Sequence, residues 1–374
     1  MPALFVTGMQ RSGTTLLDKL LANHPQISLL SQPFPLLFVE VKRRFLALLG
    51  EAEARYPLGD LFLETRYGAA DLHRFLAGLA LDAADLRAVF AGMAGYSGQY
   101  TRFTPERLAA ALETLAPGDL AAVLAQLYRS LAQEPTAGWY GGKEALGEEL
   151  LPFLLDRGFR ALVIVRDPRD VLASLNHGRG PEHAGRLKPT LFNVRNWRKS
   201  AAFVLHLEDH PNFFWLRYED LVARPREVLE RISSFLAIEP FAAELLAGPL
   251  RDQEGRLWPG NSSHGERFGI ETASVSRYRE ILPPEVARYV EAACWPELRC
   301  FGYEVDLAWE AVPEVIRGFA DPYEGARPEL KGCAAGAAGE LRRCELLRGD
   351  GGSEVQPYFL FDDVCHRLRE VLPA

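Results

Sequence analysis

The sequence lacks the features that mark secreted, membrane-spanning or nucleic-acid-coating proteins. Only five of its 374 residues are cysteine, and no two of them form a Cys-x-x-Cys pair. No run approaches the roughly 20 apolar residues that a membrane helix needs. Positive charge is not in excess, since 42 lysines and arginines stand against 50 aspartates and glutamates. These absences argue against a zinc centre, a membrane span and broad nucleic-acid binding, and leave room for a local basic pocket.

Two further absences concern the compartment. The first apolar run, residues 3–6, is not preceded by the charged start and apolar segment of a secretory leader. The cysteines all fall in the last quarter of the chain, where nothing suggests a disulfide framework, at Cys294, Cys300, Cys333, Cys344 and Cys365. Thiols of this kind are typical of a reducing environment. We therefore predict a soluble cytoplasmic protein that needs no metal.

What the sequence does contain is an alternation of apolar strands and amphipathic helices. Apolar runs predict strands at residues 3–6, 27–30, 161–165 and 213–216. Helical patterns follow the first of these runs and recur at residues 168–175 and 225–236. Strands that alternate with helices predict an α/β fold, with a parallel sheet flanked by helices.

The remaining segments are assigned by composition. Residues from about 50 to 140 are rich in alanine and leucine with helical spacing, and are interpreted as a helical insertion over the site. Residues 1–305 are predicted to form one domain. Residues 306–374 are treated as a C-terminal extension of unknown role, because the alternating pattern weakens there.

The first chemical motif lies between the first strand and the first helix. Residues 8–15 fit the phosphate-loop frame G-x-x-x-x-G-K-[ST], except that Thr14 replaces the lysine. Backbone N–H groups at such a helix start point toward an anion. In nucleoside triphosphatases the lysine reaches the outer phosphates, so its absence disfavours a triphosphate. A basic side chain, Arg11, stands inside the loop instead.

The second motif follows the clearest strand. Arg166 ends the apolar run 161–165, and Ser174 lies eight positions later on the predicted helix. Both side chains should face the crevice at the carboxyl ends of the strands. Arginine offers the forked donors that a phosphate accepts. The alternative is a plain ion pair of Arg166 with Asp167 or Asp170.

Together the two motifs resemble those of sulfotransferases that use 3′-phosphoadenosine-5′-phosphosulfate (PAPS), of a bacterial or tyrosylprotein-like branch. The resemblance implies a P-loop-type fold. It also implies that the phosphosulfate is bound by Arg11, Ser12, Gly13, Thr14 and Thr15, and the 3′-phosphate by Arg166 and Ser174. Weaker matches at Tyr218-Glu219-Asp220-Leu221, at residues 260–263 and at residues 277–279 add Tyr218, Asn261, Ser262 and Ser263 as donor-binding residues.

The implied reaction is the in-line transfer of a sulfuryl group to the hydroxyl of a small-molecule or carrier-bound acceptor, with release of adenosine 3′,5′-bisphosphate. Arg11 and the loop amides would stabilise the charge on the leaving phosphate. A general base should take the acceptor proton. Glu144, 22 positions before Arg166, stands where relatives carry a histidine, and the preceding Lys143 would hold the bridging oxygen or sulfuryl group. An exposed Lys-Glu pair in a glycine-rich loop is the alternative.

Other residues could supply the base. His177 follows the helix of Ser174 and could face the pocket, so it is kept as a catalytic candidate. The remaining rivals are His24, His264 and Glu40. Geometry has to choose among them.

Two other functions stay open. An ATP-dependent kinase would explain the phosphate loop, although the loop lysine and a clear second acidic strand end are missing. A non-catalytic protein that binds the bisphosphate would explain the departure from histidine at Glu144. The acceptor is least determined: aromatic residues suggest an apolar lid for a lipid or phenol, but equally a helical core, at Phe34, Phe38, Phe62, Tyr96 and Phe103.

Overall fold

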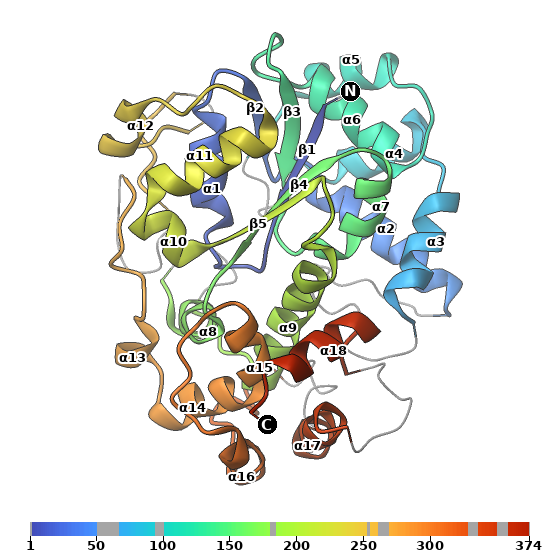
Figure 1. Ribbon diagram of the computed structural model, residues 1–374. Coiled ribbons are helices and arrows are strands. Elements are labelled where there is room, and N and C mark those ends of the chain that lie inside the picture. The colour runs from blue at the N-terminus through green and yellow to red at the C-terminus, as the bar shows by residue number, and fades with distance from the viewer. Residues whose placement is uncertain are drawn as a thin grey trace.

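The centre of the molecule is a parallel sheet of five strands (Figure 1). The computed structural model describes residues 2–50, 67–93, 101–179, 185–252, 255–260, 269–327, 336–349 and 358–373. The strands are β1 (Ala3–Thr7), β2 (Ile27–Ser31), β3 (Trp139–Lys143), β4 (Arg160–Val165) and β5 (Phe213–Arg217). Their order in the sheet is β2-β3-β1-β4-β5, and each neighbouring pair is parallel. The predicted α/β fold with a parallel sheet is confirmed.

Parallel register brings the carboxyl ends of the strands to one edge. Val6 of β1 is paired with Lys143 of β3 on one side and with Leu162 of β4 on the other. Ser31 of β2 pairs with Lys143 in turn. The loops that leave these ends therefore emerge side by side, which is where open α/β sheets bind ligands.

Each face of the sheet is covered by its own group of helices. On one face, Leu4 and Val6 pack with α1 (Thr14–Ala22), α10 (Tyr218–Ala223) and α11 (Pro225–Leu236). The other face carries Phe5 and Val163 and packs with helices that include α2 (Pro35–Leu48), α7 (Leu151–Asp156) and α9 (Thr190–Leu207).

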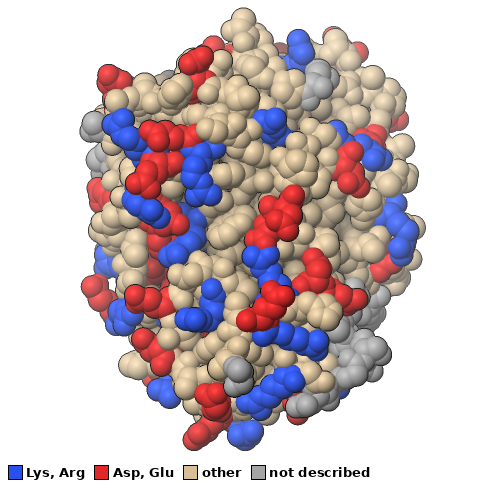
Figure 2. All heavy atoms as spheres, in the orientation of Figure 1, with Lys and Arg blue, Asp and Glu red and all other residues tan. Residues whose placement is uncertain are grey.

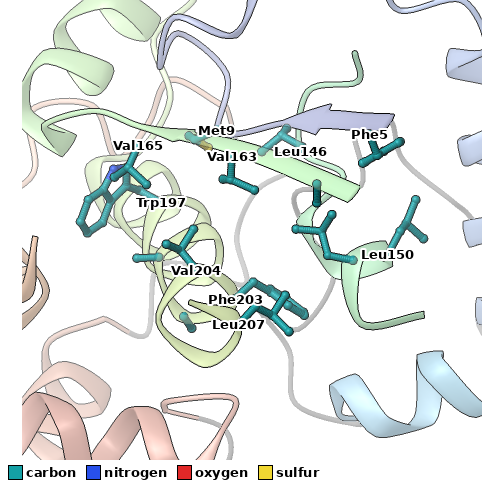
Figure 3. Packing of buried hydrophobic residues seen from close by; sticks show 14 of the residues in the cluster. Phe5, Met9, Leu146, Leu150, Val163, Val165, Trp197, Phe203, Val204 and Leu207 are labelled. Carbon is teal, nitrogen blue, oxygen red and sulfur yellow. The ribbon is translucent and has the colours of Figure 1, made fainter. Parts of the chain in front are cut away.

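Figure 3 shows α9 on this second face. Val163 and Val165 of β4 stand over Trp197 and Val204 of the helix. Met9, from the loop that follows β1, belongs to the same buried cluster. The loop at residues 8–13 is thus tied to the core through an apolar side chain.

A helical segment connects β2 to β3. After α2 it contains α3 (Ala69–Gly78), α4 (Ala83–Ala91), α5 (Pro105–Glu113) and α6 (Leu120–Ser130). Thr101 reaches the end of β2, where its amide donates to the Ser31 carbonyl and its hydroxyl accepts from the Ser31 amide, both at 2.8 Å. This segment therefore touches the carboxyl edge of the sheet. That it covers the site stays a prediction.

The last third of the chain packs against the body rather than standing apart from it. Its helices are α12 (Ala243–Ala247), α13 (Tyr278–Ile281), α14 (Pro284–Ala293), α15 (Trp295–Cys300), α16 (Val312–Gly318), α17 (Gly336–Leu347) and α18 (Asp362–Glu370). Of these, α13 and α14 pack against α8 (Pro168–His177). Glu340 of α17 pairs with Arg195 and Arg198 of α9. These pairs and its buried apolar residues join the predicted extension to the main core. The boundary at residue 305 stays a prediction.

Two short turns of 3₁₀-helix complete the described elements, η3 (Glu148–Leu150) and η4 (Trp309–Ala311). Among the described helices, none is long and apolar enough to cross a bilayer. On the face seen in Figure 2, Lys and Arg side chains are interspersed with Asp and Glu side chains and form no continuous basic surface. The cysteines within the described segments, Cys294, Cys300, Cys344 and Cys365, are free thiols, and Cys333 lies outside those segments.

Candidate active site

The loop between β1 and α1 adopts a conformation that depends on its glycines. Gly8 and Gly13 have φ angles of 154° and 96°, and Arg11 has a φ of 66°. A side chain at Gly8 would lie 2.5 Å from the Ile164 carbonyl oxygen of β4. The backbone therefore passes too close to the neighbouring strand for any residue but glycine.

The start of α1 is suited to an anion. Its cap residue is Gly13, which has no side chain to occupy the first N–H groups, and Thr14, Thr15 and Leu16 follow without an acidic residue. The hydroxyl of Ser12 is buried and has no hydrogen-bond partner among the described residues. A buried donor without a partner is costly unless a ligand satisfies it. The loop thus offers the donors that a phosphate accepts.

The second motif meets the first directly. The Arg11 Nε donates to the Ser174 hydroxyl of α8 at 2.9 Å. One terminal nitrogen of Arg166 donates to the Arg11 carbonyl at 2.9 Å, and the other donates to the Ser274 carbonyl at 2.5 Å. Residues predicted to bind the two ends of one donor therefore form a single cluster.

The ion pair that sequence reasoning kept as an alternative for Arg166 is present as well. Arg166 lies 3.8 Å from the Asp170 carboxylate, while Asp167 pairs with Arg169 at 2.7 Å. Asp167 also accepts from the Arg169 amide, so it caps α8 as predicted. The pair with Asp170 does not displace Arg166 from the loop.

The segment at residues 274–278 was missed as part of this cluster. Asp170 accepts from the backbone amides of Ser276 and Tyr278, both at 2.8 Å, and so fixes this segment over α8. The Ser274 carbonyl then meets Arg166. Only the weak match at residues 277–279 pointed here. The neighbouring predicted residues Asn261, Ser262, Ser263 and His264 lie outside the described residues.

Tyr218 lies between the two motifs. The Arg166 guanidinium carbon is 4.6 Å from the centre of its ring, a cation–π contact. A side chain at Gly13 would come within 2.4 Å of the same ring. The next residue, Glu219, accepts from the Asp167 amide at 3.0 Å. The segment at residues 218–221 thus supports both motifs.

Lys143 and Glu144 lie in a strand end and not in an exposed loop. Lys143 is the last residue of β3, and the exposed fractions of the two residues are 0% and 3%. The interpretation as an exposed pair is therefore wrong. The Lys143 ammonium donates to the Gln32 side-chain oxygen at 2.9 Å, while a Glu144 oxygen accepts from the Phe34 amide at 3.3 Å.

Burial moves both pKa values toward each other. Desolvation lowers the pKa of Lys143 to about 8 and raises the pKa of Glu144 to about 8. Glu144 lies near Tyr128, whose pKa is raised by its own burial and then by the Glu144 charge. A carboxyl group with a pKa near the working pH suits a general base.

The other candidate bases have different surroundings. His177 bonds through Nε2 to the Tyr323 hydroxyl at 2.6 Å, and burial lowers its pKa. Glu40 pairs with Arg43 and Arg44, which hold its pKa at about 2. His24 follows α1, as predicted, and its Nε2 lies 2.9 Å from the Glu239 carbonyl. Glu40 and His24 are engaged in structural contacts.

Within the described segments, no three His, Cys, Asp or Glu side chains gather as a metal ion would require. That the protein needs no metal stays a prediction.

Comparison with known proteins adds the family. The sequence profile of the sulfotransferase family matches residues 2–242. The chain belongs to the sulfotransferase family. The match includes all five strands, both phosphate motifs and the Lys143–Glu144 segment of this sulfotransferase, whereas residues 274–278 lie beyond it. The family resemblance drawn from the two motifs is confirmed, and with it sulfuryl transfer as the general activity.

Solved structures with similarity to this sulfotransferase carry related names. The sulfotransferase domain of the Synechococcus PCC 7002 olefin synthase is 21% identical, covers 81% of this chain and 95% of its own, and gives a TM-score of 0.48. The sulfotransferase domain of the curacin biosynthetic pathway is 21% identical, with coverages of 82% and 99% and a TM-score of 0.44. The family assignment rests on the sequence match and not on these likenesses. No curated protein matches the chain significantly.

Proposed function

We propose that this sulfotransferase uses PAPS as its donor and transfers the sulfuryl group in line to an acceptor hydroxyl. Adenosine 3′,5′-bisphosphate is the second product. The acceptor is a small molecule or a group on a carrier.

The observation that carries the proposal is the contact between the two motifs. Arg11 donates to Ser174, and Arg166 donates to the Arg11 carbonyl, although the motifs are 155 residues apart. A donor with a phosphosulfate at one end and a 3′-phosphate at the other needs two anion sites close together. An ordinary nucleoside triphosphate does not need the second site.

The residues present also fit such a donor chemically. The Ser12 hydroxyl, buried without a described partner, and the open start of α1 suit the 5′-phosphosulfate. Arg166 and Ser174 suit the 3′-phosphate, and Tyr218 supports Arg166 through its ring. Asn261, Ser262 and Ser263 remain proposed donor ligands.

In the proposed reaction, a protein side chain acts at each bond that forms or breaks. The acceptor oxygen forms a bond to sulfur while the bond from sulfur to the 5′-phosphate oxygen breaks, and the electron pair stays on that phosphate. Arg11 and the loop amides stabilise this charge. Lys143 holds the bridging oxygen or the sulfuryl group. Glu144 takes the acceptor proton, and its raised pKa makes it a strong enough base once it is ionised.

His177 is a weaker proposal for the base. It stands one turn beyond Ser174 on α8, but its ring bonds to Tyr323 from the last part of the chain. The cytoplasmic location predicted from the cysteines also belongs to this proposal.

The test is acceptor-dependent release of adenosine 3′,5′-bisphosphate from PAPS, with a panel of phenols, aliphatic alcohols and carrier-bound hydroxyls. Wild-type protein should release bisphosphate only when an acceptor is present. Arg11→Ala should lower the release by about 10²–10³-fold, and Arg43→Ala, a change of an arginine exposed on α2, should leave it unchanged. If the protein binds bisphosphate but transfers nothing to any acceptor class, a non-catalytic function replaces this one.

A further inference from the structure

A buried carboxylate lies on the helix that follows the phosphate loop. Asp18 of α1 is fully buried, and neither of its oxygens has a hydrogen-bond partner among the described residues. The Lys19 ammonium lies 3.4 Å away. A buried charge of this kind is costly unless an opposite charge offsets it.

The side chain of Asp18 lies on the face of α1 that meets the sheet. Thr14, Leu17, Asp18 and Leu21 share this face by their helical spacing, and all four are buried. Thr14 lies beside the residue that follows β1, because its methyl group is 3.1 Å from where a Gly8 side chain would begin. Asp18 is therefore one turn below the anion-binding start of the helix.

Lys143 lies on the same face of the sheet. Its register partner in β1 is Val6, which packs in the apolar cluster with Leu17 and Leu21. Paired residues of neighbouring strands point to the same side. Glu144 points to the other side of the sheet, because side chains alternate along a strand and position 144 shares its side with Gly142. Gly142 lies against the Tyr128 ring of α6. The fully buried Lys143 ammonium is thus directed toward α1.

The charges around Lys143 come from two elements. From α1, Asp18 raises the pKa of Lys143 and Lys19 lowers it. The charge of Glu144, the residue after β3, also raises it, while burial lowers it most of all. The neutral side-chain amide of Gln32, the residue after β2, accepts one hydrogen bond from Lys143. Asp18 is the acidic group that faces Lys143 from the phosphate-loop helix.

We propose that Asp18 is a positioning residue that keeps the Lys143 ammonium charged and directed toward the donor. The role of Lys143 in this statement rests on the proposed function. Helix α1 then acts on the leaving group in two ways. Its first turn begins at the phosphate loop, and Asp18 in its second turn positions Lys143.

The test is an NMR titration of the full ligand-free chain labelled with ¹³C at the lysine Cε positions. Lys143→Arg assigns the signal. Asp18→Asn, which keeps the shape of the side chain, should move the Lys143 midpoint down by about one pH unit or more, as expected for loss of a nearby opposite charge. Lys19→Met should move the midpoint up.

The Lys143 midpoint is expected to move in opposite directions in the two variants, so either variant alone tests the proposal if the other does not fold. A Lys143 midpoint that is unchanged in Asp18→Asn, or that falls in Lys19→Met, would overturn it. In turnover of PAPS, Asp18→Asn should lower kcat more than it raises KM, and activity should be lost at a lower pH than in the wild type. Asp18→Asn should still bind adenosine 3′,5′-bisphosphate. If the proposed donor is wrong, the wild-type protein itself will not bind the bisphosphate, so the two failures can be told apart.

Discussion

The donor cluster and the end of β3 differ in how their sequence neighbours relate in space. Arg11, Arg166 and Ser174 come from separate parts of the chain and touch one another. Lys143 and Glu144 are adjacent in sequence and point to opposite faces of the sheet. A loop can gather neighbouring side chains at one point, whereas a strand separates them. In the proposed reaction, Lys143 and Glu144 therefore approach the donor and the acceptor from two sides of the strand.

The largest effect should come from the β3 side of this comparison. Glu144→Gln removes the proposed base and should lower kcat by about 10²–10⁴-fold. A base must be ionised, and burial raises the pKa of Glu144 above its ordinary value, so wild-type activity should rise with pH from the acid side. Lys143 must stay charged, and burial lowers its pKa, so activity should fall again as the pH rises further. The measurement is kcat against pH.

The variant profile separates the two residues. Glu144→Gln should lose the rising limb and keep the falling one, while Lys143→Met should do the reverse. Glu134→Gln, a change at an exposed position, is the matched control and should keep both limbs. An unchanged rising limb in Glu144→Gln would assign the base elsewhere, with His177 the first candidate.

A slightly smaller effect is expected on the donor side. Arg11→Ala should lower the turnover of PAPS by about 10²–10³-fold, because it removes a donor aimed at the leaving phosphate. Arg11→Lys keeps the charge but loses the fork that also reaches Ser174, and should recover only part of the rate. Equal activity of the alanine variant and the wild type would contradict the leaving-group role.

Arg166→Ala should act on binding more than on chemistry. Loss of a charge-assisted hydrogen bond to phosphate costs about 1.5–3 kcal/mol, or about 10–100-fold in affinity for adenosine 3′,5′-bisphosphate. Adenosine 5′-monophosphate lacks the 3′-phosphate, so its affinity should change much less. Calorimetric titration with both nucleotides checks this. Equal losses for the two would mean that Arg166 only supports the loop through the Arg11 carbonyl.

The smallest effect is expected at Tyr218. Tyr218→Leu removes the ring under Arg166 and should weaken bisphosphate binding by about 2–30-fold, the range of a cation–π contact. Tyr218→Phe keeps the ring and should bind nearly as well as the wild type. A large loss in the phenylalanine variant would instead assign a role to the hydroxyl.

Most of the sheet could be predicted because its strands are continuous apolar runs. β3 was missed because two of its five residues are glycines, which resemble a loop. The structure gives the reason for them: a side chain at Gly141 would lie 2.2 Å from the Leu4 carbonyl oxygen, and one at Gly142 would lie 2.6 Å from the Tyr128 ring. Close packing, and not a turn, requires glycine here.

Residues predicted from a side-chain motif lie together, whereas residues that contribute through the backbone or through burial were missed. Arg11, Arg166 and Ser174 come together as their motifs indicate. Ser274 was missed because its contribution is a carbonyl oxygen, which any residue could offer. Asp18 was missed because its importance comes from complete burial, which a single charged residue in an amphipathic helix does not reveal.

The central claim is that the two motifs bind one donor with a 3′-phosphate. Calorimetric titration of the wild-type protein with adenosine 3′,5′-bisphosphate and, separately, with ATP and Mg²⁺ tests it most directly. We predict saturable one-site binding of the bisphosphate, weakened in Arg166→Ala, and much weaker binding of ATP. Tight binding of ATP with Mg²⁺ and no binding of the bisphosphate would contradict the account and favour a kinase.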